Sequence, residues 1–245
     1  METATKQVIS QHAFLDEDTC KAMSDKVCSF KSEWQRTVDD EMDVFFLGTS
    51  SFVSAHPKFD KNFESFQKEI AKTNPFLKTN FGDFYEKLKE RLSVILNGPV
   101  RFHEKLSYPG FIIWLGEKED KNRYYPVHYD SQYRVIPWHE LYQTSEIQDV
   151  ITITLPIHLP SGGGRLRTWG PLDAQAMKQS FFESLEVVIK SRECTTHHYQ
   201  LGHFLIQHGL VIHQPAPTGD FREGEMRMTV QFHGIKINDS WTLYW

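Results

Sequence analysis

The chain has 245 residues and a formal net charge of −5, with 40 % hydrophobic and 24 % charged residues. This composition is that of an ordinary globular protein, and the acidic balance argues against a broad basic surface for nucleic acid or anionic lipid, although it leaves room for a local basic groove. No stretch approaches the ~20 apolar residues that span a bilayer, and no apolar segment follows a basic start as in a signal peptide. The cysteines, which are Cys20, Cys28 and Cys194, are expected to be reduced thiols. We therefore expect a cytoplasmic protein with no membrane partner.

Residues 12–98 have the apolar spacing of helices. Apolar residues recur there at steps of three and four, which places them on one face of a helix. Three such stripes are predicted as helices, at residues 16–34, 59–70 and 81–95. The second is expected to end at Asn74-Pro75 and the third at Asn97-Gly98-Pro99, because proline and glycine end helices. We expect this region to flank a β core within one domain of residues 1–245.

From residue 100 to 245 the pattern changes to short apolar runs rich in β-branched and aromatic residues, separated by turn signals such as Ser161-Gly162-Gly163-Gly164. The predicted strands are Gly110–Leu115, Tyr124–Tyr129, Val150–Leu159, Leu185–Ile189, Phe204–Ile206, Leu210–Ile212 and Met226–Phe232. A brief helix is expected near Asp173–Gln179. Many short strands in one stretch are typical of a β sandwich or barrel. The predicted fold class is therefore mainly β with N-terminal helices, an α+β chain.

The first sign of chemistry is His128-Tyr129-Asp130. On a strand, residues i and i+2 point to the same face, so His128 and Asp130 would project side by side. Two histidines and one carboxylate leave open positions on a metal, which suits a non-haem Fe(II) ion that must bind a cosubstrate and O2. Composition alone produces a His-x-Asp tripeptide roughly 0.7 times in this chain. The tripeptide therefore indicates a metal site only if a third ligand can be found elsewhere in the sequence.

His213 is the candidate for that third ligand. It ends an apolar strand that follows a tight turn at His208-Gly209, and Arg227-Met228-Thr229 comes fourteen residues later. Arg227 and Thr229 share one strand face, where a guanidinium fork and a hydroxyl can anchor the far end of a dicarboxylate. His208 is the alternative third ligand, and Arg222 is the alternative anchor.

Taken in order, these three segments resemble the iron and cosubstrate motifs of the Fe(II)/2-oxoglutarate-dependent dioxygenases, in particular of their prolyl-hydroxylase and phytanoyl-CoA-hydroxylase branches. Further segments similar to that superfamily are Tyr108-Pro109-Gly110-Phe111, Gly163-Gly164-Arg165-Leu166 and Ala13-Phe14-Leu15-Asp16-Glu17-Asp18-Thr19-Cys20. The resemblance covers residues 105–233 and part of the N-terminus. It implies a double-stranded β-helix, a jelly-roll or cupin-like core, with the site at one mouth of the barrel.

The resemblance also implies roles for single residues. His128, Asp130 and His213 would bind Fe(II), and Arg227 and Thr229 would hold 2-oxoglutarate. With O2, such an enzyme hydroxylates or otherwise oxidises a C–H bond of a small molecule, such as an amino acid or a natural-product intermediate, and forms succinate and CO2. The expected substrate-side residues are Tyr125, Gln132, Tyr133, Arg167, Trp169 and Gln231. His233, on the same strand face as Arg227, either lines this pocket or fills the barrel end.

Other functions stay open at this point. Many prolyl hydroxylases anchor the cosubstrate with Lys, so Arg227 argues against their substrate class. A nucleic-acid demethylase of the same superfamily is disfavoured, because a second Arg typically follows the first by six residues, where this chain has His233, and because the net charge is negative. A peptide demethylase or hydroxylase of that superfamily stays open as an alternative. A cupin-type metal-binding protein without oxygenase activity is disfavoured, because no His-x-His with a following Glu occurs near Val127. We expect a small-molecule substrate and a monomer or homodimer.

Overall fold

The computed structural model describes residues 8–37, 43–54, 62–116, 126–144, 146–173, 177–178, 184–215, 222 and 224–245. Its helices include α1 (Glu17–Ser29), α2 (Ser51–Ser54), α3 (Phe63–Ile95), α4 (Trp138–Tyr142) and α6 (Leu185–Val188), with 3-10 turns at η1 (Lys31–Glu33), η3 (Gln132–Val135) and η4 (Ile189–Ser191). Its strands include β1 (Ile9–Ala13), β2 (Gln35–Arg36), β3 (Val44–Leu47), β4 (Val100–Phe102), β5 (Gly110–Leu115), β6 (Asp149–His158), β7 (Arg165–Pro171), β8 (Thr195–His198), β9 (His203–His208), β10 (Val211–Pro215), β11 (Met226–Ile237) and β12 (Ser240–Tyr244).

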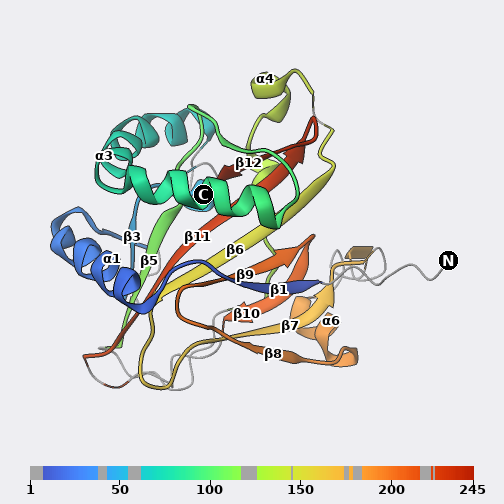
Figure 1. Cartoon of the computed structure of the whole chain (residues 1–245). Coiled ribbons are helices and arrows are strands. Elements are labelled where there is room, and N and C mark those ends of the chain that lie inside the picture. The colour runs from blue at the N-terminus through green and yellow to red at the C-terminus, as the bar shows by residue number, and fades with distance from the viewer. Residues whose placement is uncertain are drawn as a thin grey trace.

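Two sheets form the β core. The larger sheet has the order β1-β9-β6-β11-β5-β3-β2, with β12 paired to β11 and β4 paired to β12, and the smaller sheet has the order β10-β7-β8. Nearly all of these pairings are antiparallel; only β12 and β4 run parallel. Figure 1 shows the smaller sheet lying below the long strands β6 and β11 of the larger one. The prediction of a mainly β, double-stranded β-helix core with N-terminal helices is confirmed.

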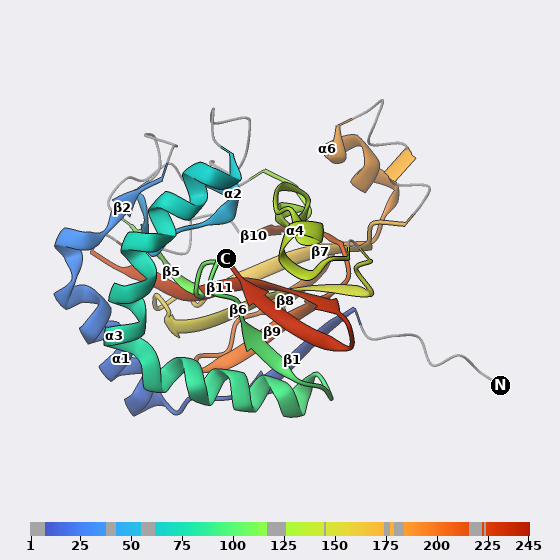
Figure 2. The same ribbon diagram turned by 90° about the horizontal axis from the view of Figure 1, so that it is seen from above.

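The larger sheet has one apolar face and one polar face, as β11 shows most clearly. Met228, Val230 and Phe232 are fully buried in an apolar cluster that also contains residues of α1 and α3. Arg227 and His233 alternate with them and are also buried, each 5 % exposed. Because side chains alternate along a strand, these polar residues point away from the helices, into the space between the sheets. Figures 1 and 2 show α1 and α3 together on one side of the larger sheet.

The first predicted helix exists but is shorter than its apolar stripe. Asp16 caps it, because the Asp16 carboxylate accepts a hydrogen bond from the backbone N–H of Thr19 at 2.7 Å. The helix ends at Ser29, so Phe30 and Trp34 lie beyond it. Both still pack against the main apolar cluster, which explains why the stripe continues past the helix end.

The expected helix end at Asn74-Pro75 is wrong. α3 continues through Pro75, and its backbone leaves helical geometry only at Phe81, where φ is −129° and ψ is 18°. The Asn74 side chain binds the backbone of Leu106 at 2.8 Å and of Tyr108 at 3.1 Å. These tertiary bonds fix the segment around the proline and outweigh its local preference.

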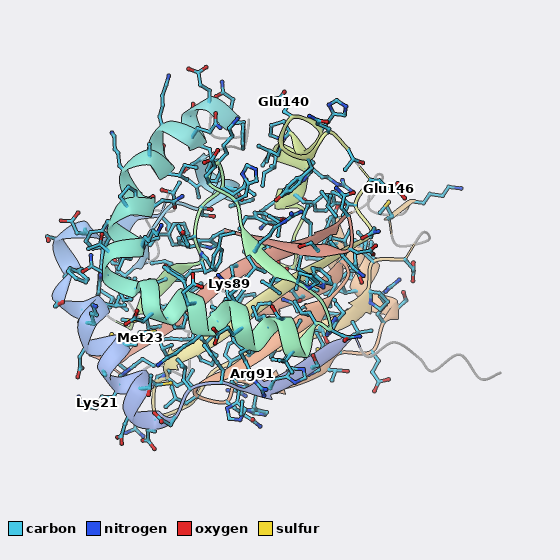
Figure 3. The ribbon with its side chains drawn as sticks, turned by 45° about the horizontal axis from the view of Figure 1, so that its top comes forward. Lys21, Met23, Lys89, Arg91, Glu140 and Glu146 are labelled. Carbon is cyan, nitrogen blue, oxygen red and sulfur yellow. The ribbon has the colours of Figure 1, made fainter. Side chains whose placement is uncertain are left out.

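Figure 3 shows α1 and α3 in front of the strands, with Met23, Lys89 and Arg91 labelled on them. Phe59, which opens the predicted second stripe, lies outside the described residues.

The strand predicted at Leu185–Ile189 is also wrong, because this segment forms α6 followed by η4. Leu185, Val188 and Ile189 have helical spacing and pack in one apolar cluster with Trp169. The brief helix expected near Asp173–Gln179 lies largely outside the described residues, within which the N–H of Met177 donates to the carbonyl of Asp173 at 2.9 Å.

The other predicted strands have counterparts, but their bounds differ in places. Of the strand predicted at Tyr124–Tyr129, the described residues form only an isolated bridge at His128. β11 runs five residues past the predicted end at Phe232. The strands β1, β2, β3, β4, β7, β8 and β12 were not predicted.

No helix in the described part of the chain combines the length and the apolar character needed to cross a membrane. A single domain, a cytoplasmic location and a monomeric or homodimeric state stay predictions.

Gly110 provides a stability test of the packing between β5 and the end of the chain. A Cβ atom at Gly110 would lie 1.8 Å from the ring of Trp245, which is 2 % exposed. We expect Gly110→Ala to displace this ring and to lower the free energy of unfolding by about 1–3 kcal/mol, measured by urea denaturation. In Gly82→Ala, the added Cβ has nothing within 4 Å, so this helical control should be more stable by roughly 0.5–1 kcal/mol. Equal effects of the two substitutions would contradict the packing described.

Candidate metal centre

The site begins with a backbone pairing between two distant segments. The N–H of His128 donates to the carbonyl of His213 at 2.9 Å, and the N–H of His213 donates to the carbonyl of His128 at 2.8 Å. Residues that exchange both bonds in an antiparallel pair carry their side chains on the same face. The two imidazole rings accordingly lie with their centroids 4.2 Å apart.

Both histidines are held in the same tautomer. The Nδ1 atom of His128 lies 2.8 Å from the carbonyl oxygen of Pro126, and Nδ1 of His213 lies 2.9 Å from that of Val211. A carbonyl oxygen can only accept, so each Nδ1 must carry the proton. In the neutral ring the lone pair then lies on Nε2, the atom through which each histidine could bind a metal.

Asp130 completes the group. Its Oδ2 atom lies 3.7 Å from Nε2 of His213, and its Oδ1 atom lies 4.0 Å from Nε2 of His128. One possible ligand atom from each of the three residues lies within 4.8 Å of the others. The structure thus brings together the three residues that the sequence predicted as iron ligands.

The protonation states also suit a divalent cation. Partial burial and the neighbouring His213 lower the pKa of His128 to about 4, so its ring is neutral at pH 7. Burial alone would raise the pKa of Asp130, but the imidazoles around it and a hydrogen bond from Gln132 lower it more strongly, so the carboxylate is ionised. Two imidazole nitrogens and one carboxylate form a donor set that fits a non-haem Fe(II) ion with open positions.

The carboxylate of Asp130 is hydrogen-bonded at both oxygens. Gln132 donates from Nε2 to Oδ1 at 3.0 Å, and Thr152 donates from its hydroxyl to Oδ2 at 2.8 Å. Thr152 belongs to β6, whereas His213 belongs to β10. The group therefore lies between the two sheets and is contacted by both.

Arg227 and Thr229 lie on the polar face of β11. They are 5 % and 4 % exposed, so both are enclosed in the barrel. The Arg227 guanidinium lies over the ring of Trp114, its cross-strand partner on β5, at 4.6 Å from the ring centroid. A buried cation that packs on an aromatic ring is suited to bind an anion, because a low dielectric strengthens the attraction between the two charges.

Tyr199 joins this region, and the sequence did not point to it. Burial raises the pKa of its phenol, with an opposing effect from the charge of Arg227 and a smaller supporting effect from Asp130. The phenol is therefore within electrostatic reach of both the predicted anchor and the metal group. A Cβ at Gly164 would lie 2.7 Å from the Tyr199 ring and 3.5 Å from Cδ of Arg227. The glycine turn thus allows these side chains to approach.

The alternative candidates lie elsewhere. His208 bonds the Ser10 hydroxyl at 3.0 Å and stands opposite Ile151, on the helix-facing side of the larger sheet. Arg222 is exposed, and its backbone N–H donates to Glu225. Neither belongs to the metal group.

The predicted substrate-side residues are scattered. Gln132 and Tyr133 begin η3, two and three residues after Asp130, and Gln231 shares the polar face of β11 with Arg227. Arg167 and Trp169 alternate with Thr168, the cross-strand partner of His213. They therefore occupy the opposite face of the smaller sheet, where Trp169 packs in the apolar cluster near α6. Tyr125 lies outside the described residues.

Thr152, which contacts Asp130, carried a signal that could have been used. Thr152 and Thr154 interrupt an otherwise apolar β6 at alternate positions, which indicates that one strand face is polar. His233 bonds Thr152 through Nδ1 at 3.1 Å, and burial, partly offset by Asp130, lowers the pKa of His233. Tyr199 gave no such signal, because its approach to Arg227 depends on contacts distant in sequence.

No protein-family model matches the sequence, and no curated protein matches it. Among solved structures, the chain is similar to an N-substituted L-amino acid dioxygenase from Burkholderia ambifaria, with a TM-score of 0.58 and 12 % sequence identity over 98 % of this chain and 87 % of that one. The dioxygenase of the same name in complex with alpha-ketoglutarate gives a TM-score of 0.52 and 12 % identity over 98 % of this chain and 86 % of that one. The protein therefore shares the double-stranded β-helix fold of these dioxygenases.

Proposed function

We propose that this protein is an Fe(II)- and 2-oxoglutarate-dependent oxygenase that oxidises a C–H bond of a small organic molecule, with succinate and CO2 as coproducts. The observation that carries the proposal is the group of His128, Asp130 and His213, whose ligand atoms lie within 4.8 Å of one another. The buried Arg227 on the inner face of β11 supports the cosubstrate assignment. The shared fold with a dioxygenase that binds alpha-ketoglutarate agrees with both.

The proposed ligands of Fe(II) are Nε2 of His128, Nε2 of His213 and the carboxylate of Asp130. When bound, the ion supplies the redox chemistry that activates O2. The protein contributes a fixed tautomer at each histidine and a carboxylate held at both oxygens. With three protein ligands, the ion would keep other coordination positions for cosubstrate and O2.

The proposed anchor of 2-oxoglutarate is Arg227, which pairs with the carboxylate far from the metal. Thr229 is two residues further on the same strand face and adds a hydroxyl. Burial keeps water away from this pairing, so the charge-assisted bonds fix the cosubstrate firmly.

The proposed substrate is a small molecule, such as an amino acid or a natural-product intermediate. Gln132 and Tyr133 are proposed to contact it, because they lie two and three residues after the proposed ligand Asp130. Gln231 adds an amide on the inner face of β11. Tyr125 stays a candidate substrate contact on the basis of the sequence alone. The name of the similar dioxygenase refers to N-substituted L-amino acids, which makes such compounds the first to assay by succinate release.

Anaerobic spectroscopy tests the metal and cosubstrate together. Adding Fe(II) and 2-oxoglutarate to the metal-free protein should produce a visible metal-to-ligand charge-transfer band, because the cosubstrate chelates the bound ion. Asp130→Asn, which is matched in shape, should lose the band because it removes the anionic ligand. Folded protein that binds Fe(II) without producing a band would falsify the cosubstrate assignment.

Arg227→Met separates the anchor from the metal ligands. The substitution keeps an apolar stem against Trp114 and removes the charge. We expect 2-oxoglutarate to bind about 10- to 100-fold more weakly, because charge-assisted hydrogen bonds are lost, while the affinity for Fe(II) changes little. Titration of the charge-transfer band measures the first quantity and a competing chelator measures the second.

Arg222→Met is the matched control, since Arg222 is exposed and outside the metal group. It should leave both affinities unchanged. An equal loss of metal and cosubstrate affinity in Arg227→Met would remove the basis for the anchor.

A further inference from the structure

Three buried polar side chains form a chain that leads away from the metal group. Asp130, Thr152 and His233 are 8 %, 4 % and 5 % exposed. The Thr152 hydroxyl lies 2.8 Å from Oδ2 of Asp130 and 3.1 Å from Nδ1 of His233. The chain therefore links a proposed iron ligand to a histidine that is not part of the metal group.

The direction of the hydrogen bonds follows from the donors available. An ionised carboxylate can only accept, so Thr152 gives its single hydroxyl proton to Asp130. The hydroxyl oxygen must then accept from His233, which fixes a proton on Nδ1 of that ring. Every bond points towards Asp130, and aligned bonds of this kind polarise and strengthen one another.

The backbone fixes the two supporting residues in place. Thr152 on β6 and His233 on β11 are direct cross-strand partners, so their side chains stand on the same face. On its other side, His233 is paired in register with Tyr244 of β12, and the two ring centroids are 5.5 Å apart. His233 is thus held between two strands and has little freedom to reorient.

We propose that Thr152 and His233 are positioning residues that orient the Asp130 carboxylate and set its strength as a metal ligand. This inference rests on the proposed function, since it assigns Asp130 to the metal. Gln132 fixes Oδ1 and the Thr152–His233 pair fixes Oδ2, so the plane of the carboxylate is set before a metal binds. Partners that orient a ligand from behind typically change metal affinity by about 10–100-fold when they are removed.

The test compares three substitutions on β6. Thr152→Val removes the hydroxyl at nearly constant shape, and Thr152→Ser retains it. Thr154→Val makes the same chemical change two residues along the same strand face, where the side chain is similarly buried at 6 % exposure. Affinity for Co(II) is measured against a competing chelator, and the visible ligand-field bands of Co(II) report the geometry at the metal.

We expect Thr152→Val to bind Co(II) about 10–100-fold more weakly and with shifted bands. Thr152→Ser should lie within a few-fold of the unsubstituted protein, and Thr154→Val should match it. A folded Thr152→Val protein with unchanged affinity and unchanged bands overturns the proposal.

Substitutions at His233 give an independent result if Thr152→Val does not fold. His233→Asn places an amide N–H close to the position of Nδ1, whereas His233→Leu has similar volume and no donor. His233→Asn should retain more of the Co(II) affinity than His233→Leu. Equal affinities of these two variants overturn the role of His233.

A nitrogen-15 NMR spectrum of the metal-free protein separates this inference from the proposed function. We expect His233 to carry its proton on Nδ1 and to lose that hydrogen-bonded signal in Thr152→Val. If the unsubstituted protein binds no metal but shows this signal, the proposed function fails and the hydrogen-bonded chain is supported. If it binds metal and His233 is protonated only at Nε2, the proposed hydrogen bonding from His233 through Thr152 to Asp130 is overturned and the proposed function stands.

Discussion

The buried carboxylate of Asp130 is the constraint on which the interior of this fold depends. An ionised carboxylate taken out of water is unfavourable by several kcal/mol unless hydrogen bonds and positive charge compensate it. Hydrogen bonds provide this compensation, because Gln132 donates to Oδ1 and Thr152 of the larger sheet donates to Oδ2. The space between the sheets must therefore be lined by polar side chains, and it cannot also serve as the apolar core.

The apolar core lies instead between the larger sheet and the helices. Met228, Val230 and Phe232 on β11 pack in the same cluster as Leu77 and Leu88 of α3. Fully burying one such side chain contributes ~1.5–3 kcal/mol, so this layer outweighs the few hydrogen bonds around the metal group. The helices thus stabilise the sheet from outside and leave its inner face for chemistry. This division explains why one strand carries both core residues and Arg227.

The sequence predicted the parts of the site that have a local signature. His128-Tyr129-Asp130 and Arg227-Met228-Thr229 have i, i+2 spacing. The order of these segments around His213 then led to the prediction of the third ligand and of the cosubstrate anchor. Short apolar runs were less informative, because residues 185–189 satisfy helical and strand patterns equally well until their packing partners are known. The helix end predicted at Pro75 was wrong for a related reason, since the Asn74 side chain holds α3 through tertiary hydrogen bonds that no local pattern contains.

Gly164 shows how a motif can be noticed in a sequence before its physical role can be known. Gly163-Gly164-Arg165-Leu166 resembled a family turn, but no local pattern explained why glycine is needed there. In the structure a Cβ at Gly164 would lie 2.7 Å from the Tyr199 ring, which would have to move. Tyr199 in turn lies within electrostatic reach of both Arg227 and Asp130. The missing side chain therefore matters because the turn before β7 can approach both the Tyr199 ring and the stem of Arg227, an arrangement that exists only once both sheets are assembled.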